Sequence, residues 1–123
     1  MDVHHCLLCL GSNYHYGARL AAARLALMQD FPGIRFSAEM ETEAIGGTFL
    51  SPFCNQLARF TTFLCAEEVR LRLKRIECDN GRLPGDKALG IVKLDIDLLM
   101  YDSTVLKPED MRREFVKLLL EGF

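Results

Sequence analysis

The alternation of apolar and polar residues divides the first part of the chain into a strand and a helix. Residues 3–10 are mostly apolar and run into Gly11-Ser12-Asn13, a pattern that predicts a largely buried strand followed by a turn. Apolar residues then recur at helical spacing, at Leu20, Ala23, Leu27 and Phe31. Pro32-Gly33 follows directly, so we expect the helix to end there.

The middle of the chain reads as two strands and a second helix. Residues 34–42 alternate between apolar and polar side chains, which is typical of a strand with one exposed face. Residues 53–64 form a β-rich run, expected to pair antiparallel to the previous strand across a loop of about ten residues. Residues 66–77 place their apolar positions on one helical face, and Asn80-Gly81 is a suitable end for this helix.

The last third completes a ferredoxin-like pattern. A loop over residues 82–92 precedes a strand at 93–101, and Pro108 begins a final helix with apolar residues at 111, 115, 118 and 119. The order β-α-β-β-α-β plus a terminal helix predicts a single α+β domain over residues 1–123. Its antiparallel sheet would carry helices on one face, which leaves the other face free for a ligand.

Composition narrows the classes of partner. The chain has 123 residues and a formal net charge of −2, which disfavours purely electrostatic binding to nucleic acid or to an anionic membrane. It contains no apolar run of the ~18 residues that a membrane helix needs, and its first residues lack the basic start of a signal peptide. We therefore expect a cytoplasmic protein, either a monomer or a homodimer.

The cysteines and the first two histidines favour a structural interpretation. The five cysteines, at positions 6, 9, 54, 65 and 78, lie in apolar contexts, where a free thiol acts as a small hydrophobic side chain. A disulfide framework is not expected. In a strand, His5 and Cys9 share a face but are separated by about 13 Å, so a single zinc ion cannot join them.

Two aspartates give the sharpest chemical signal. Asp95 and Asp97 alternate with apolar residues and would project from one face of a strand, about 6.6 Å apart along the chain. Such a pair can bind a cation, and oxygen ligands favour Mg²⁺ completed by substrate phosphates. The alternative is an ordinary acidic strand face, although aspartate is a poor strand former and like charges repel. The spacing alone leaves both interpretations open.

Other charged residues near these aspartates are less specific. Glu77 by itself predicts a surface carboxylate, and the basic residues between positions 72 and 93 predict mostly solvent-exposed side chains. Beside a phosphate-bearing ligand, however, Arg82, Lys87 and Lys93 could close over the ligand's charge from a loop containing glycine and proline. The sequence holds neither a Walker A motif nor a GxGxxG motif.

Taken in order, several short motifs resemble the 6-hydroxymethyl-7,8-dihydropterin pyrophosphokinase family of folate biosynthesis. They cover most of residues 3–101 and are Leu8-Cys9-Leu10-Gly11-Ser12-Asn13, Thr42, Phe53-Cys54-Asn55, Arg75-Ile76-Glu77, Gly81-Arg82 and Leu94-Asp95-Ile96-Asp97-Leu98-Leu99. The family has the ferredoxin-like fold inferred above. Each motif is short, but their ordered series is fairly specific.

This resemblance implies transfer of pyrophosphate from ATP to the hydroxymethyl oxygen of a reduced pterin, with release of AMP. Asp95 and Asp97 would hold two Mg²⁺ ions that bridge the triphosphate, and Arg82 would assist catalysis. The implied pterin-binding residues are Thr42, Ile45, Phe53, Asn55 and Phe115. The implied nucleotide-binding residues are Glu77, Arg82, Lys87, Lys93 and Arg113.

Departures from the family pattern support a second hypothesis. The family usually carries an arginine-rich loop with an aromatic residue before the LDxD strand, and a histidine that contacts ATP after it. Here Lys93 precedes that strand, and no histidine follows His15. Lysine lacks the planar fork of arginine. The alternative function is therefore a weakly active or inactive relative that serves as a ligand-binding or structural module.

Overall fold

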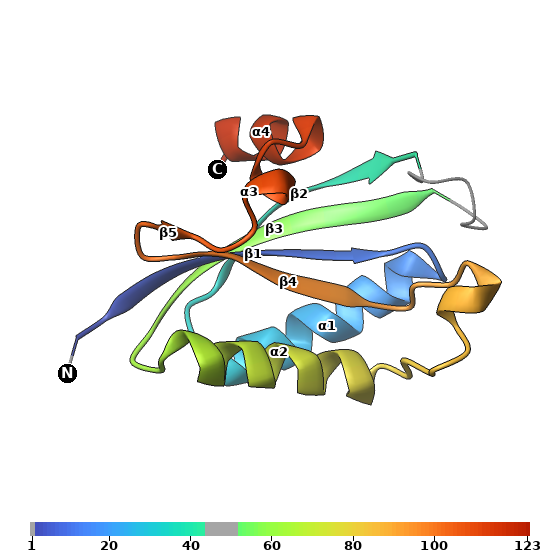
Figure 1. Ribbon diagram of the computed structural model, residues 1–123, viewed down its shortest axis with the longest axis horizontal. Helices are drawn as coiled ribbons and strands as arrows, with labels where there is room; N and C mark the ends of the chain where they lie inside the picture. The colour runs from blue at the N-terminus through green and yellow to red at the C-terminus, as the bar shows by residue number, and fades with distance from the viewer. Residues whose placement is uncertain (1, 44–51) are drawn as a thin grey trace.

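The computed structural model describes residues 2–43 and 52–123 and is built on a five-stranded antiparallel sheet (Figure 1). Its strands lie in the order β2-β3-β1-β4-β5. They are β1 (His4–Ser12), β2 (Arg35–Thr42), β3 (Phe53–Thr62), β4 (Asp95–Tyr101) and β5 (Thr104–Val105). The helices are α1 (Tyr16–Asp30), α2 (Ala66–Asp79), the short 3₁₀ helix η1 (Lys87–Leu89), α3 (Pro108–Met111) and α4 (Glu114–Glu121). The α+β, ferredoxin-like fold expected from the sequence is confirmed.

The main core lies between the sheet and the helices α1 and α2, which cover the same face (Figure 1). Leu20 and Leu27 of α1 and Leu73 of α2 pack there in full burial against Leu8 of the central strand. The helical spacing read from the sequence therefore identified the buried faces of both helices. Burial of such a face, more than helix propensity, holds helices of this length in place.

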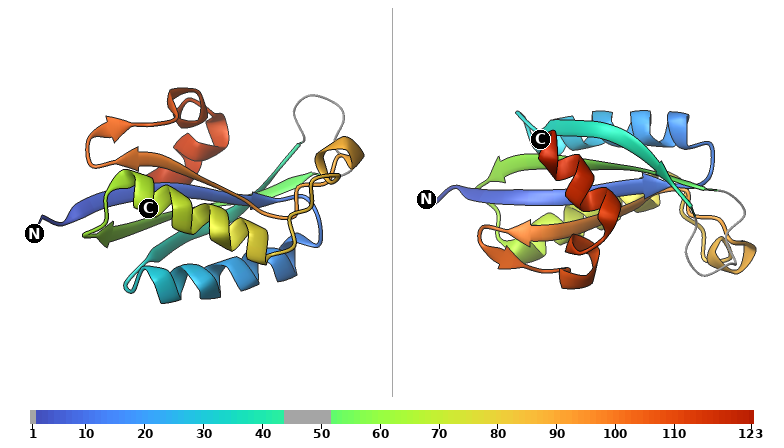
Figure 2. Two further views of the ribbon diagram at one scale, coloured as in Figure 1. Left: turned by 60° about the horizontal axis from the view of Figure 1, so that its bottom comes forward. Right: turned by 90° about the horizontal axis from the view of Figure 1, so that it is seen from above.

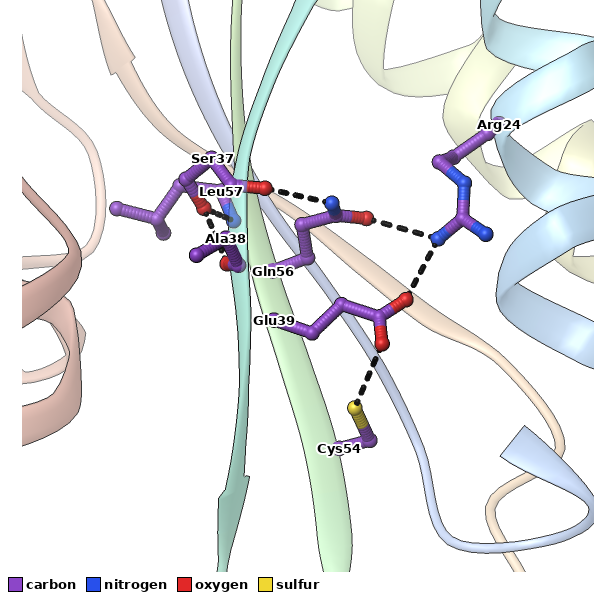
Figure 3. A network of polar contacts seen from close by, with 7 residues as sticks. All are labelled: Arg24, Ser37, Ala38, Glu39, Cys54, Gln56 and Leu57. Carbon is purple, nitrogen blue, oxygen red and sulfur yellow. Dashed lines mark hydrogen bonds and ion pairs between the residues drawn. The ribbon is translucent and has the colours of Figure 1, made fainter. Parts of the chain in front are cut away.

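A polar network ties α1 to the edge strand β2 (Figure 3). Arg24 of α1 donates hydrogen bonds to Glu39 at 2.9 Å and to Gln56 at 3.1 Å. The register between β2 and β3 shifts around Ser37, where the Leu57 N–H donates to the Ser37 hydroxyl at 2.9 Å. The side chain thus satisfies a backbone donor at an irregularity that would otherwise leave it unpaired.

The second face of the sheet is partly covered, which corrects the expectation that it is free. Helix α4 crosses above the strands (Figure 2, right) and places Val116 and Leu119 against Leu7, Leu57 and Leu99. These five residues are all buried. The chain therefore has a second, smaller core on this face, and only the remainder of the face is available to a ligand.

The expected final helix is two helices. The chain is extended at Arg113, with φ −66° and ψ 139°, so α3 ends before α4 begins. This break changes the phase of the apolar positions. Leu118, expected on the buried face of one continuous helix, is 44% exposed, whereas Val116 is fully buried.

Three strand ends also differ by two residues from the sequence expectation, and one of them is the end of β3 at Thr62 in place of residue 64. β1 continues to Ser12, because Gly11 pairs with Asn55 of β3 on one side and with Asp95 of β4 on the other. Hydrogen bonding from both neighbours extends the central strand through a glycine that predicted a turn. β4 begins at Asp95, and Lys93 lies before it.

The cysteines are all unpaired thiols, but their surroundings differ from one another. Cys6 and Cys54 are buried as expected, whereas Cys65 and Cys78 are exposed near the two ends of α2. The expectation of an apolar context was wrong for this second pair. Among the described helices, none has the length and apolar character needed to cross a membrane.

The second core predicts unequal effects for two neighbouring leucines of α4. Leu119→Ala should lower the free energy of unfolding by about 2–3 kcal/mol, because it removes a buried side chain and leaves a cavity. The matched variant Leu118→Ala, on the exposed side, should cost less than about 1 kcal/mol. Urea denaturation measures both, and equal losses would mean that α4 does not pack as described.

Candidate active site

Strand β4 carries two carboxylates on the face of the sheet that α4 partly covers, next to the small core. Asp95 lies opposite Gly11, and Asp97 lies opposite Cys9. Ile96, between the two aspartates, points into the main core on the other face. The alternation in the sequence therefore predicted correctly that the two aspartates share one side of the strand.

The pKa values of both carboxyl groups are raised above their usual range. Burial, followed by the neighbouring charge of Asp95, raises the pKa of Asp97 from 3.8 to about 6. Burial is also the main cause of a raised pKa at Asp95. Both groups resist carrying a charge at the same time, and a cation between them would relieve this repulsion.

The donor set suits a hard cation. Asp95 and Asp97 offer only oxygen atoms, which Mg²⁺ prefers. Burial raises the pKa of the adjacent Cys9 thiol, so without a metal Cys9 is a neutral thiol at neutral pH. In the described residues, no three His, Cys, Asp or Glu side chains form a complete metal cage. A bound Mg²⁺ would therefore take its other ligands from water or substrate.

Glu77 is buried, which corrects the interpretation of it as a surface carboxylate. Its side chain is only 4% exposed. One carboxylate oxygen accepts a hydrogen bond from the Ile96 backbone N–H at 2.7 Å, and the other accepts from Arg82 at 2.7 Å. Glu77 thus joins the end of α2 to β4 and draws the Arg82 guanidinium to 3.9 Å from Asp95.

The C-terminal end of α2 is held by two cations. Arg19 of α1 donates to the carbonyl oxygen of Asn80, and Lys93 donates to the carbonyl oxygen of Gly81 at 3.0 Å. Gly81 adopts φ 87°, as expected for a residue that ends a helix. Lys93 is 13% exposed, so the expectation of a solvent-facing lysine was wrong.

The loop over residues 82–92 forms one wall of the site and is anchored by Asn13. The Asn13 side chain donates to the Gly90 carbonyl at 2.9 Å and accepts from the Val92 N–H at 2.6 Å. The Asn13 backbone N–H also donates to the Val92 carbonyl at 3.0 Å. η1 lies within this loop and exposes Lys87 toward the open side.

Asn55 and Thr42 form the opposite wall. The Asn55 amide donates to the Thr42 hydroxyl at 2.8 Å, which fixes the orientation of the amide. Gly11 makes room for Asn55, because a Cβ at position 11 would lie 2.6 Å from the Asn55 Oδ1 atom. Phe53 pairs with Thr42 at the end of β2. A larger residue at position 11 would therefore push the Asn55 amide out of this position.

The last two helices close the third side. Phe115, at the start of α4, faces the same space as Asp97 and Arg113. The Arg113 guanidinium pairs with Asp110 at 3.2 Å. Asp110 carries no sequence signal beyond lying three residues before an arginine.

These walls enclose one cleft of about 1140 Å³. The expected site residues that line it are Thr42, Phe53, Asn55, Arg82, Lys87, Lys93, Asp95, Asp97, Arg113 and Phe115. Glu77 lies behind this lining, and Ile45 lies outside the described residues. Polar or charged lining residues that the sequence did not indicate are Cys9, Glu43, Asp86, Asp110 and Glu114. They come from five different segments, so only the folded chain reveals them.

Comparison with known proteins gives one family. The family model described as 7,8-dihydro-6-hydroxymethylpterin-pyrophosphokinase matches residues 7–122. No curated protein matches the chain. The family match agrees with the resemblance carried by the ordered motifs and extends it through α4.

Glu77 should contribute strongly to the free energy of unfolding. Glu77→Ala should lower the free energy of unfolding by about 2–3 kcal/mol, because the Ile96 N–H and Arg82 both lose their acceptor. Glu77→Gln, which keeps an acceptor oxygen, should cost about 1 kcal/mol. Urea denaturation measures both losses, with Glu67→Ala as an exposed control on the same helix. A Glu77→Ala protein as stable as this control would contradict the assigned contacts.

Asp97 should destabilise the metal-free protein at neutral pH. Because its pKa is higher in the folded state, the folded protein binds a proton more tightly, and stability falls as pH rises from about 4 to about 6. Above that range the loss persists. Asp97→Asn should therefore be more stable than wild type by about 1 kcal/mol at pH 7.5, a value reduced for partial solvent screening.

Chemical denaturation in EDTA tests this expectation. At pH 4 the wild-type carboxyl is protonated, so the difference between the two proteins should largely disappear. An equal stability difference at pH 4 and pH 7.5 would show that the effect arises from packing and not from charge.

Proposed function

Because the chain belongs to the 7,8-dihydro-6-hydroxymethylpterin-pyrophosphokinase family, we propose that it transfers pyrophosphate from ATP to the hydroxymethyl group of a reduced pterin. The family is one of transferases in folate biosynthesis. In the proposed reaction, the pterin hydroxyl oxygen forms a bond to the β-phosphorus of ATP. The bond from that phosphorus to the oxygen bridging the α-phosphate breaks, AMP leaves with the bridging oxygen, and the hydroxyl proton is lost.

The paired carboxylates support a metal-dependent reaction. Asp95 and Asp97 would hold two Mg²⁺ ions through oxygen ligands. Bound Mg²⁺ would supply charge neutralisation on the triphosphate oxygens. The raised pKa values of both aspartates support this assignment, because a nearby cation would favour their charged forms at neutral pH.

The basic side chains support a phosphate-binding role for one side of the cleft. The Arg82 side chain is 50% exposed even though one of its nitrogens is held by Glu77. Its other N–H groups remain available to phosphate oxygens. Lys87 and Arg113 line the same cleft from η1 and from the start of α4. These residues would position the triphosphate, because phosphoryl-type transfer depends mainly on positioning and charge.

The opposite wall supports recognition of a flat heterocycle. Asn55 uses one amide N–H for Thr42, which leaves its carbonyl oxygen and its second N–H for the amide edge of a pterin. Phe53 and Phe115 both line the cleft, and their rings would stack on the two faces of the pterin. We also include Ile45 in the pterin site, on the basis of the family resemblance alone.

The gathering of these groups around one cleft is the observation that carries the proposal. AMP release from ATP and 6-hydroxymethyl-7,8-dihydropterin tests it, with Mg²⁺ removed by EDTA and then restored. Asp95→Asn and Asp97→Asn should each reduce AMP formation by about a hundredfold or more, because each removes a charged ligand. Glu68→Gln, which removes a carboxylate on the outer side of α2, should retain full activity.

Two outcomes of this assay would contradict the proposed function. If the wild-type protein forms no more AMP than the Asp95→Asn and Asp97→Asn variants, the chain does not catalyse this reaction. Activity that persists in EDTA would likewise reject the metal-dependent mechanism.

A second candidate function is a ligand-binding relative without appreciable turnover. It is favoured by the state of the cleft cations, because Arg82, Lys93 and Arg113 each already pair with a carboxylate of the protein. Calorimetry distinguishes the two functions. Pterin binding without AMP formation supports the binding module, and rapid AMP formation supports the enzyme.

A further inference from the structure

Lys93 is the most deeply engaged cation of the cleft. Its ammonium nitrogen donates to the Gly81 carbonyl at 3.0 Å and lies 3.4 Å from an Asp86 carboxylate oxygen. It also lies 5.8 Å from the centre of the Tyr14 ring. The Lys93 side chain is 13% exposed and has little contact with water. These protein partners therefore stabilise its positive charge in place of water.

Asp86 has two roles, which act through the same carboxylate oxygen. Its side chain is 11% exposed, and one carboxylate oxygen accepts the Leu83 backbone N–H at 2.9 Å. This hydrogen bond stabilises the loop over residues 82–92, whereas the negative charge pairs with Lys93. Both Asp86 and Lys93 line the cleft, so a phosphate group arriving there meets a lysine that already has an anionic partner.

We propose that Asp86 is a positioning residue that acts as a resident anion on Lys93 and thereby limits the affinity of the cleft for polyphosphate. This inference rests on the proposed function, which supplies the nucleotide as ligand. Phosphate oxygens and the Asp86 carboxylate compete for the same ammonium group, because lysine binds phosphate as a point charge. The bound nucleotide must therefore displace Asp86 or share Lys93 with it.

The other paired cations differ from Lys93. Arg82 is half-exposed and can add phosphate contacts while it keeps Glu77. Arg113 is 46% exposed and pairs with Asp110, three residues earlier in the chain, and such surface pairs contribute little. In contrast, Lys93 and Asp86 are both largely removed from water. Loss of one charge from a buried pair has a large effect on the remaining partner.

Asp86→Asn separates the two roles. Asparagine keeps a carbonyl oxygen that can accept the Leu83 N–H, but it removes the negative charge beside Lys93. The Asp86 oxygen that accepts the Leu83 N–H is the one that lies 3.4 Å from Lys93, so in the free variant an uncharged asparagine oxygen, Gly81 and the Tyr14 ring surround the ammonium. A polyphosphate would then restore an anionic partner, so the variant should bind it more tightly although the free protein is less stable.

Calorimetric titration with Mg²⁺ and the non-hydrolysable nucleotide α,β-methylene-ATP measures this effect. The dissociation constant should fall about threefold to tenfold in Asp86→Asn. Glu68→Gln is the matched control, because it also removes one carboxylate from an ion pair, with Arg72, away from the cleft. Its dissociation constant should equal that of wild type. A merely structural role for Asp86 predicts weaker binding in Asp86→Asn, the opposite direction.

Removal of Lys93 provides a second route that does not depend on Asp86→Asn folding well. Lys93→Met should weaken binding, and the double variant Asp86→Asn with Lys93→Met should bind no more tightly than Lys93→Met alone. A gain that persists in the double variant would overturn the inference, because it would not act through Lys93. Equal binding by wild type and Lys93→Met would overturn it as well.

The same titration with inorganic tripolyphosphate and Mg²⁺ separates this inference from the proposed function. Tighter tripolyphosphate binding by Asp86→Asn, with no nucleotide binding by either protein, would support the role of Asp86 and reject the ATP-dependent function. Equal or weaker binding of both probes by Asp86→Asn would overturn the role of Asp86 alone. Failure of both proteins to bind either probe would overturn both.

Discussion

The hydrogen bonds of one buried carboxylate determine how the site is assembled. Glu77 lies at the end of α2, accepts the Ile96 N–H of β4 and holds the Arg82 guanidinium. Helix, strand and loop thus meet at a side chain that is only 4% exposed. An unpaired charge at such depth is costly, so the Glu77 carboxylate depends on both of these hydrogen bonds. The position of Arg82 beside Asp95 follows from this arrangement.

The sheet divides its two faces between stability and chemistry. One face carries the main core beneath α1 and α2, and the other carries a small core beneath α4 next to the cleft. Leu99 belongs to that small core and also borders the cleft, two residues after Asp97. One face of β4 therefore provides both the two site carboxylates and a core residue, at positions two residues apart. Because the pKa of Asp97 is raised, its charged carboxylate should reduce stability at neutral pH where no cation neutralises it.

The cleft is lined by both acidic and basic side chains, and most of the basic ones are paired with carboxylates. Its lining includes the carboxylates of Asp86, Asp95, Asp97 and Asp110 as well as four basic side chains. Arg82, Lys93 and Arg113 have anionic partners within the protein. A polyphosphate ligand therefore meets little unneutralised positive charge. Binding would depend on cations at the aspartates and on exchange of partners by the basic residues.

The sequence alone determined the four long strands, the first two helices and the family. Residues two apart in a strand share a face because of the local backbone geometry, so the sequence placed Asp95 and Asp97 on one side of β4. Helical spacing identified the buried sides of α1 and α2, because it too follows from local backbone geometry. Local patterns carry no information about partners distant in the chain. The burial of Glu77, the Asp86–Lys93 pair and the need for Gly11 beside Asn55 depend on contacts between separate segments. The break at Arg113 likewise altered which residues of α4 are buried. Tertiary structure decided these features, because burial and ionic pairing depend on which segments meet in space.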